Sequence, residues 1–315
     1  MTDELAEVTD DYCQSLWQSV CNWGRWGVTD ELGALNLITP AIRALAASSV
    51  TEGISIGCGN PWPVAPGPHN MWPAEHYMIR AGDDCDYPGI DGLSVSMDYI
   101  GVQQHGIACS HIDALCHVFV DHKMYNGYPA SEVKSTGALK NDVRPMNEGI
   151  VGRGVLLDLP ALLDLPFLPG DMRISKTLLE AAAARQNLEL SSGDILLVHK
   201  GRQARVAQEG LFDPESAGMP GLHPECAELL HETGISLLGS DYMNDPQPNW
   251  ACSKWPIPIH YLGICGMGMT LLHNLDTQKL ADQCNALQRW HFLLTIAPLK
   301  IAGATGSPVN PIAMF

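Results

Sequence analysis

Three histidines and one aspartate are concentrated in one short stretch of this 315-residue chain. Residues 105–117 read His-Gly-Ile-Ala-Cys-Ser-His-Ile-Asp-Ala-Leu-Cys-His, so His105, His111 and His117 accompany Asp113 in a chain with twelve histidines. Imidazole and carboxylate groups are the usual protein ligands of Zn²⁺ and other divalent transition metals. The stretch therefore predicts a metal centre.

The spacing of these residues allows their side chains to converge. In an extended strand, His111 and Asp113 lie on one face, about 6.6 Å apart along the backbone. In a helix that begins at Asp113, this residue and His117 are one turn apart on one face. His105 lies about 20 Å from His111 along a straight strand, so it joins the site only if the chain turns or bulges at Gly106.

A cation would explain how the carboxylate of Asp113 is accommodated among imidazoles. Burying an ionised carboxylate without a positive partner is costly, and a divalent ion removes that cost. A metal with an open coordination position also ionises bound water, and metal-bound hydroxide can then attack a carbonyl carbon. Closed coordination would instead indicate a non-catalytic metal-binding or small-molecule-binding protein, and a degenerate motif would hold no metal. Cys109 shows no independent sign of an activated thiol.

Composition limits the classes of partner. The chain has 35 acidic and 18 basic residues, and its net charge of −17 disfavours nucleic acid and anionic lipid surfaces. No apolar run is long enough for an ordinary transmembrane helix, and the acidic amino terminus lacks a secretory pattern. We expect a cytoplasmic protein with a small-molecule substrate, no nucleic-acid or membrane partner, and mostly reduced core cysteines.

Local patterns predict an α/β fold with a mixed, largely antiparallel sheet core and flanking helices. Thr39 and Pro40 form a helix start, residues 58–72 are too rich in proline and glycine for regular structure, and the glycines of 263–269 favour close backbone packing. Strands are expected at 92–100, 154–159, 194–199, 235–238 and 292–296. Helices are expected at 175–185, 223–233 and 275–287. No linker divides the chain, so we expect a single domain over 1–315 with a tryptophan-rich arm over about 1–40.

Several segments resemble the putative cyclase family, whose metal-dependent hydrolases include bacterial kynurenine formamidase, isatin hydrolase and a trans-dienelactone hydrolase. Residues 110–117, Ser-His-Ile-Asp-Ala-Leu-Cys-His, are similar to the family signature Thr-His-x-Asp-Ala-x-x-His. Residues 152–158, 192–198 and 238–241 resemble later family segments, and the Trp-Gly-Arg-Trp-Gly arm with 124–127 resembles its longer branch. The resemblance implies a swivelling β/β/α catalytic domain.

The resemblance also implies roles for individual residues. His111 and Asp113 would be metal ligands, and His117 would be the catalytic acid/base. His260 matches the histidine that precedes the last family ligand, and His273 stands where the family has glutamate. Replacing a carboxylate by imidazole removes one negative ligand, which weakens the case for two bridged cations.

The first ligand departs from the family pattern. The formamidases place a histidine four residues before the position of His111, where this chain has Ile107. His105 fills the role if the backbone is locally altered, and otherwise a mononuclear site is the simpler prediction. Imidazole and carboxylate serve both Zn²⁺ and Mn²⁺, so the sequence leaves the identity of the metal open.

The activity implied by the resemblance is hydrolysis of a small cyclic or aromatic amide at its C–N bond, with His117 as general acid/base. A lactone is the alternative substrate. Aromatic side chains could line a pocket for a flat ring, although several could equally fill the core: Trp23, Trp26, Trp62, Trp72, Trp250 and Tyr125. The family resemblance further implies a homodimer or homotetramer.

Overall fold

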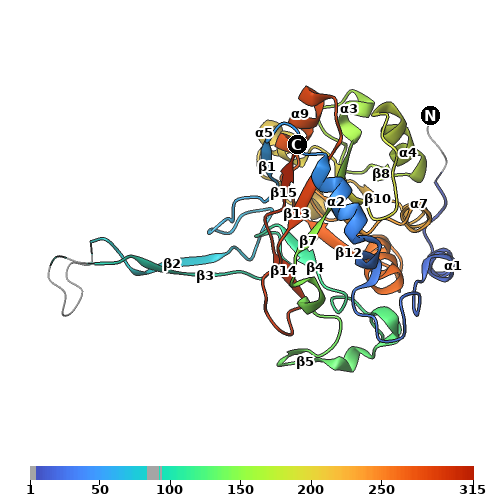
Figure 1. Ribbon diagram of the computed structural model, residues 1–315, viewed down its shortest axis with the longest axis horizontal. Helices are drawn as coiled ribbons and strands as arrows, with labels where there is room; N and C mark the ends of the chain where they lie inside the picture. Colours follow the sequence, from blue (N-terminus) through green and yellow to red (C-terminus); the bar gives the residue numbers. More distant parts are fainter. Residues whose placement is uncertain (1–4, 84–91, 93) are drawn as a thin grey trace.

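The centre of the protein is a nine-stranded mixed sheet (Figure 1). The structure is a computed structural model that describes residues 5–83, 92 and 94–315. In order across the sheet, the strands are β1 (Ser55–Gly57), β15 (Ile312–Met314), β13 (His291–Ile296), β7 (Ile150–Asp158), β9 (Ile195–His199), β11 (Leu237–Ser240), β12 (Thr270–His273), β4 (His111–Asp113) and β14 (Gly306–Pro308).

Parallel and antiparallel pairs occupy different parts of this sheet. The neighbours β7, β9, β11 and β12 run parallel to one another. All pairs on either side of them are antiparallel. The predicted α/β class with a mixed, largely antiparallel sheet is therefore confirmed. The parallel strand β9 is buried at all five positions, as expected for a strand that is covered on both faces.

Helices and loops cover the sheet on both sides. The helices are α1 (Asp10–Val20), α2 (Pro40–Ser48), α3 (Leu159–Leu163), α4 (Lys176–Arg185), α5 (Arg202–Glu209), α6 (Pro214–Ala217), α7 (Cys226–Thr233), α8 (Pro258–His260) and α9 (Gln278–Leu287), with a π-helix, η5 (Tyr261–Met267). Within the described part of the chain, no helix combines the length and apolar composition required to cross a bilayer.

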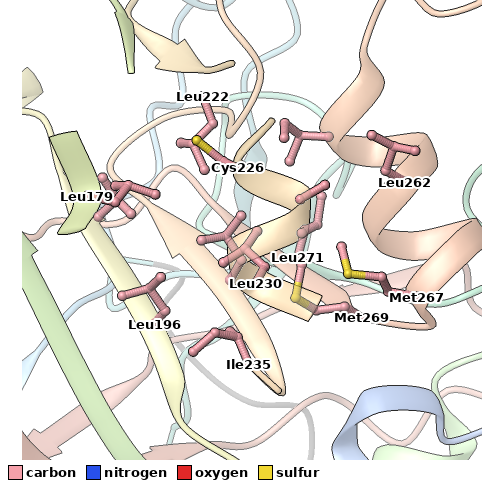
Figure 2. Packing of buried hydrophobic residues seen from close by; sticks show 14 of the residues in the cluster. Leu179, Leu196, Leu222, Cys226, Leu230, Ile235, Leu262, Met267, Met269 and Leu271 are labelled. Carbon is pink, nitrogen blue, oxygen red and sulfur yellow. The ribbon is translucent and has the colours of Figure 1, made fainter. Parts of the chain in front are cut away.

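Two hydrophobic clusters lie on opposite faces of the sheet. Leu196 of β9 packs with Leu179 of α4 and Leu230 of α7 in the first cluster, which Figure 2 shows from close by. The adjacent residue Leu197 packs in the second cluster, together with Leu280 of α9. This division follows from the alternation of side chains along a strand.

Within the described residues, three pairs of short strands lie outside the main sheet: β2 (Glu75–Arg80) with β3 (Met97–Gly101), β5 (Val133–Lys134) with β6 (Gly137–Ala138), and β8 (Arg173–Ile174) with β10 (Gly221–Leu222). The first pair forms a hairpin that projects far from the body of the molecule (Figure 1). Its apolar side chains are exposed, among them Ile79 at 54% and Ile100 at 57%. A two-stranded hairpin without a packed face is marginally stable by itself.

Most predicted helices and strands are present. Some begin or end at other residues than predicted, because backbone hydrogen bonds rather than the residue pattern set their ends. Thr39 caps α2 by accepting the amide of Ile42, and residues 58–72 contain no helix or strand beyond isolated bridges. The strand expected at 235–238 lies at Leu237–Ser240, because the amide of Ile235 bonds back to Leu230. Of the expected strand at 92–100, only Met97 onward is regular, and residue 93 lies outside the described residues.

The glycine-rich stretch 263–269 forms the end of η5 and the turn after it. Gly268 has a φ of +66°, and a Cβ atom at this position would lie 2.5 Å from the ring of Tyr125. Only glycine accommodates both the backbone conformation and the close approach. The expectation of close backbone packing in this stretch is confirmed.

Candidate metal centre

Strand β4 and its neighbour β12 bring the first histidines together. The two strands pair antiparallel in a register that places His273 opposite His111. His111 and Asp113 are two residues apart on an extended strand, so their side chains leave the same face. All three residues are buried. The prediction that Asp113 would contact a histidine is confirmed, and of the two conformations that the sequence allowed the structure has the strand.

The carboxyl group of Asp113 is surrounded by four imidazoles. Its Oδ1 atom lies 2.9 Å from Nδ1 of His105 and 3.7 Å from Nε2 of His111. Its Oδ2 atom lies 2.9 Å from Nε2 of His273 and 4.0 Å from Nε2 of His260. Two potential ligand groups therefore share Asp113, one with His105 and His111 and one with His260 and His273, and in each the ligand atoms lie within 4.8 Å of one another.

The protonation states of these groups suit a divalent cation. Burial would raise the pKa of Asp113, but interactions with His117, His273 and His105 hold it well below its usual value. Burial lowers the pKa of His111 to about 3 and also lowers that of His273. An ionised carboxylate and neutral imidazoles are the forms that bind metals, and a divalent ion would offset the desolvation of the buried Asp113 carboxylate. The residues fit a divalent ion, and Zn²⁺ and Mn²⁺ are both compatible with this donor set.

His105 reaches the cluster through the turn that the sequence analysis required. The amide of Gly106 donates to the carbonyl of Gln103 at 3.1 Å, which reverses the chain next to His105. The Nε2 atom of His105 is 2.9 Å from Oγ1 of Thr305, and this contact fixes the ring from the side opposite Asp113. The structure thus places His105, rather than Ile107, among the potential ligands.

His117 lies next to these groups without belonging to either. Its ring stacks on His105 at a centroid distance of 3.7 Å and an interplanar angle of 5°. Unlike His111, it is only partly buried. Burial lowers the pKa of His117 to about 4, and the nearby Asp113 carboxylate opposes part of this shift. A neutral, partly accessible imidazole beside a potential metal site is placed to exchange protons with a bound molecule.

Two polar residues that the sequence analysis missed hold the more distant histidines. Fully buried Asp245 accepts from Nδ1 of His260 at 2.5 Å and from the amides of Ile259 and His260 at 2.9 and 3.1 Å. This carboxylate raises the pKa of His260 against the effect of burial. Nδ2 of Asn244 lies 3.4 Å from Nδ1 of His273. Both contacts leave Nε2 facing Asp113, but no sequence spacing relates position 245 to position 260.

Two of the aromatic residues predicted to bind substrate have packing contacts instead of open faces. Nε1 of Trp23 donates to the carbonyl of Cys265 at 2.7 Å, and its ring meets Trp17 edge-on at a centroid distance of 5.6 Å. Tyr125 is completely buried, and its hydroxyl donates to Asp30 at 3.0 Å. These contacts are those of packing anchors, which was the alternative interpretation.

The other aromatic candidates occupy separate places. Trp26 is partly buried and lies under the guanidinium of Arg25 at 4.8 Å. Trp72 is 64% exposed and lines a hollow at the base of the β2–β3 hairpin. Trp250 lies under the guanidinium of Arg173 at 5.2 Å, whereas Trp62 lines a pocket with Ile107. Their assignment to substrate binding stays a prediction.

Other potential nucleophiles have unsuitable surroundings. Burial raises the pKa of Cys109 to about 12, so its thiol is protonated at neutral pH. Residues 53–57 match Gly-x-Ser-x-Gly, but Ser55 begins the edge strand β1, whereas a nucleophile elbow requires a strand-to-helix turn.

Solved structures share this fold. A crystal structure described as a novel cyclase superposes with a TM-score of 0.82 at 28% sequence identity, covering 94% of this chain and 100% of that one. Isatin hydrolase A from Labrenzia aggregata, bound to benzyl benzoate, gives a TM-score of 0.58 at 20% identity, covering 87% and 97%. A "predicted metal-dependent hydrolase" from Bacillus stearothermophilus gives 0.52 at 17% identity, covering 84% and 98%. The last two comparisons establish a common fold only, and no curated protein sequence matches the chain.

The sequence model of one family, described as "Putative cyclase", matches residues 54–244. The match spans more than half of the 315 residues and includes strand β4 with His111 and Asp113. The protein therefore belongs to the putative cyclase family.

Proposed function

We propose that this protein is a metal-dependent hydrolase that cleaves the C–N bond of a small cyclic or aromatic amide. The observation that carries the proposal is the partly exposed imidazole of His117 beside the buried carboxylate of Asp113 and its four imidazole neighbours. The proposed ligands are His105, His111, Asp113, His260 and His273. Isatin hydrolase A, which has the same fold, acts by its name on a cyclic amide, and this supports the choice of substrate class.

A divalent ion held by these ligands would polarise the substrate carbonyl and lower the pKa of water. His117 supplies the proton transfers. It is neutral at pH 7, because burial lowers its pKa to about 4, so a ring nitrogen can accept the proton of the attacking water. The same proton then moves from His117 to the leaving nitrogen, because an amine leaves far more readily than an amide anion.

The neighbours of His117 keep its ring in position for both transfers. Stacking on His105 fixes the plane of the ring, and His105 is itself fixed by Asp113 on one side and by Thr305 on the other. The low pKa also makes protonated His117 a strong acid toward the leaving group. A lactone releases an oxygen leaving group, which depends less on proton donation, so an ester substrate would use His117 less fully.

The test compares isatin with benzofuran-2,3-dione, which differs from it only by a ring oxygen in place of the N–H group. Protein reconstituted with Zn²⁺ or Mn²⁺ should open isatin at a rate well above the spontaneous rate. A larger acceleration of the oxygen analogue would establish a lactonase instead. Protein that binds metal but accelerates neither reaction would be a metal-binding or small-molecule-binding protein, and the proposal would be wrong.

A further inference from the structure

A surface pocket of about 430 Å³ adjoins the segments that carry the proposed ligands. Asn274 in its wall directly follows His273, and Ile107 lies two residues after His105. Nδ2 of Asn274 donates to the carbonyl of Ile107 at 2.9 Å, which ties the two segments together. The volume is in the range of sites that hold small molecules. The pocket therefore adjoins two of the segments that carry proposed ligands, those of His105 and His273.

Most of the pocket wall is apolar and suits a flat ring. The proline-rich loop 58–72 supplies one side, and α5 with the residues after it supplies the other. Besides Ile107, the apolar lining residues are Pro61, Trp62, Pro63, Val206, Ala207 and Leu211. The indole of Trp62 is 37% exposed, so part of it is available to a bound ring.

One wall carries the guanidinium of Arg202, whose pKa is lowered by burial, an effect that the charge of Asp241 partly opposes. Nη1 of Arg202 donates to Oδ1 of Asn274 at 3.1 Å, and its guanidinium lies 5.5 Å from the ring centre of Tyr242. Among the residues that the structure describes, no carboxylate forms an ion pair with Arg202, although Arg144 and Arg153 each have one. In a chain with a net charge of −17, an unpaired guanidinium in a pocket is available to an anion.

Two polar atoms of other pocket residues have no hydrogen-bond partner among the described residues. Oε1 of Gln203 and Nδ1 of His69 are buried and form no hydrogen bond with any residue that the structure describes. Burial and the charge of Arg202 lower the pKa of His69, so its imidazole is neutral at pH 7. Buried polar atoms normally have a partner, and a bound ligand would supply one. Arg202 is thus the positive charge of a pocket whose other polar groups are neutral.

We propose that this pocket binds the carboxylate group of a small aromatic acid, with Arg202 as the anion-binding residue and Trp62 against the ring. This assignment rests on the proposed function and narrows its substrate class: among cyclic and aromatic amides, those that carry an aromatic carboxylate should bind more tightly than neutral ones such as isatin. The carboxylate would pair with the Arg202 guanidinium, and the amide would face the wall formed by Ile107 and Asn274.

The test measures binding of benzoate and of benzamide, its neutral analogue, by calorimetry on both the metal-loaded and the metal-free protein. We expect benzoate to bind both forms, and benzamide to bind at least about 10-fold more weakly, because charge-assisted hydrogen bonds are the stronger ones. Arg202→Gln should weaken benzoate binding about 10- to 100-fold. Arg43→Gln, which changes an exposed residue of α2, is the control and should leave benzoate binding unchanged.

A second variant tests the apolar wall. Trp62→Leu should reduce the preference for benzoate over acetate while leaving acetate binding unchanged, and the unfolding temperature of each variant checks that it folds. Equal binding of benzoate and benzamide, full benzoate affinity in Arg202→Gln, or benzoate binding that requires the metal would each overturn the proposal. If benzoate binds as expected but no amide is hydrolysed, the pocket stands and the proposed function fails.

Discussion

Asp245→Asn tests whether the second layer of the site controls metal binding. The carboxylate of Asp245 accepts three hydrogen bonds, from the amide of Ile259 and from the amide and Nδ1 of His260. Asparagine has the same size but only one acceptor oxygen. Both oxygens of the native carboxylate accept hydrogen bonds, so in either orientation of the asparagine side chain its NH₂ group faces a hydrogen-bond donor.

The expected cost follows from the tautomer of His260. With Asp245, Nδ1 of His260 carries the proton and Nε2 is free to coordinate. If the amide NH₂ of asparagine donates to Nδ1, the proton moves to Nε2 and blocks coordination. Loss of a group that accepts from the non-coordinating nitrogen of a ligand histidine typically weakens metal affinity about 10- to 100-fold, which corresponds to about 1.4 to 2.7 kcal/mol of binding free energy. The unmatched amide should also destabilise the fold by about 1 to 3 kcal/mol.

The assay is competition for Zn²⁺ against a chromophoric chelator, with circular dichroism as the check on folding. Asp241→Asn is the matched control, because Asp241 is equally buried and accepts the amides of Lys200 and Arg202. That variant should lose stability but keep its metal affinity. The reasoning is refuted if folded Asp245→Asn binds Zn²⁺ as tightly as the native protein, or if both variants lose affinity equally.

Three further predictions concern catalysis, pH and assembly. His117→Ala should lower amide turnover at least about 100-fold while elemental analysis finds the metal content unchanged; loss of the metal would reassign His117 as a ligand. Metal-free protein should lose stability as pH falls from about 6.5 to about 4. In the folded protein the pKa of His111 is lowered to about 3 and that of His117 to about 4, so over this pH range the unfolded chain binds protons that the folded protein does not. The opposite shift of His260 offsets part of this loss, and a urea-unfolding free energy that is flat or rises as the pH falls over that range would contradict the prediction. The exposed apolar hairpin should contact a second copy in a dimer or tetramer, so Ile79→Lys with Ile100→Lys should reduce the mass measured by light scattering, and an unchanged oligomer would rule out this contact.

The sequence alone predicted those structural features that depend on residues close together in the chain. A threonine followed by proline predicted the start of α2, and two-residue spacing predicted that His111 and Asp113 share a face. The length of a straight strand also predicted that the chain must turn near Gly106 for His105 to join the site. The structure contains that turn. Each of these predictions depends on residues fewer than ten positions apart.

Contacts between distant segments could not be predicted in this way. The pairing of β12 with β4 sets His273 opposite His111 across 162 positions, and only the register of the sheet determines it. Asp245 gave no signal, because its partner His260 belongs to a separate helical turn. The role of Tyr125 could not be predicted from its residue type, because an aromatic side chain can either bind a ligand or fill the core. Its burial against Gly268 is set by the tertiary structure.

The central claim is that a divalent cation binds between Asp113 and the imidazoles around it. Anomalous diffraction from crystals of protein purified without added metal, recorded on both sides of the zinc and manganese absorption edges, tests it most directly. We expect an anomalous peak about 2 Å from a carboxylate oxygen of Asp113 and from at least two imidazole nitrogens. Well-ordered Asp113 and His111 side chains with no such peak, in a preparation that hydrolyses amides at its full rate, would contradict the account.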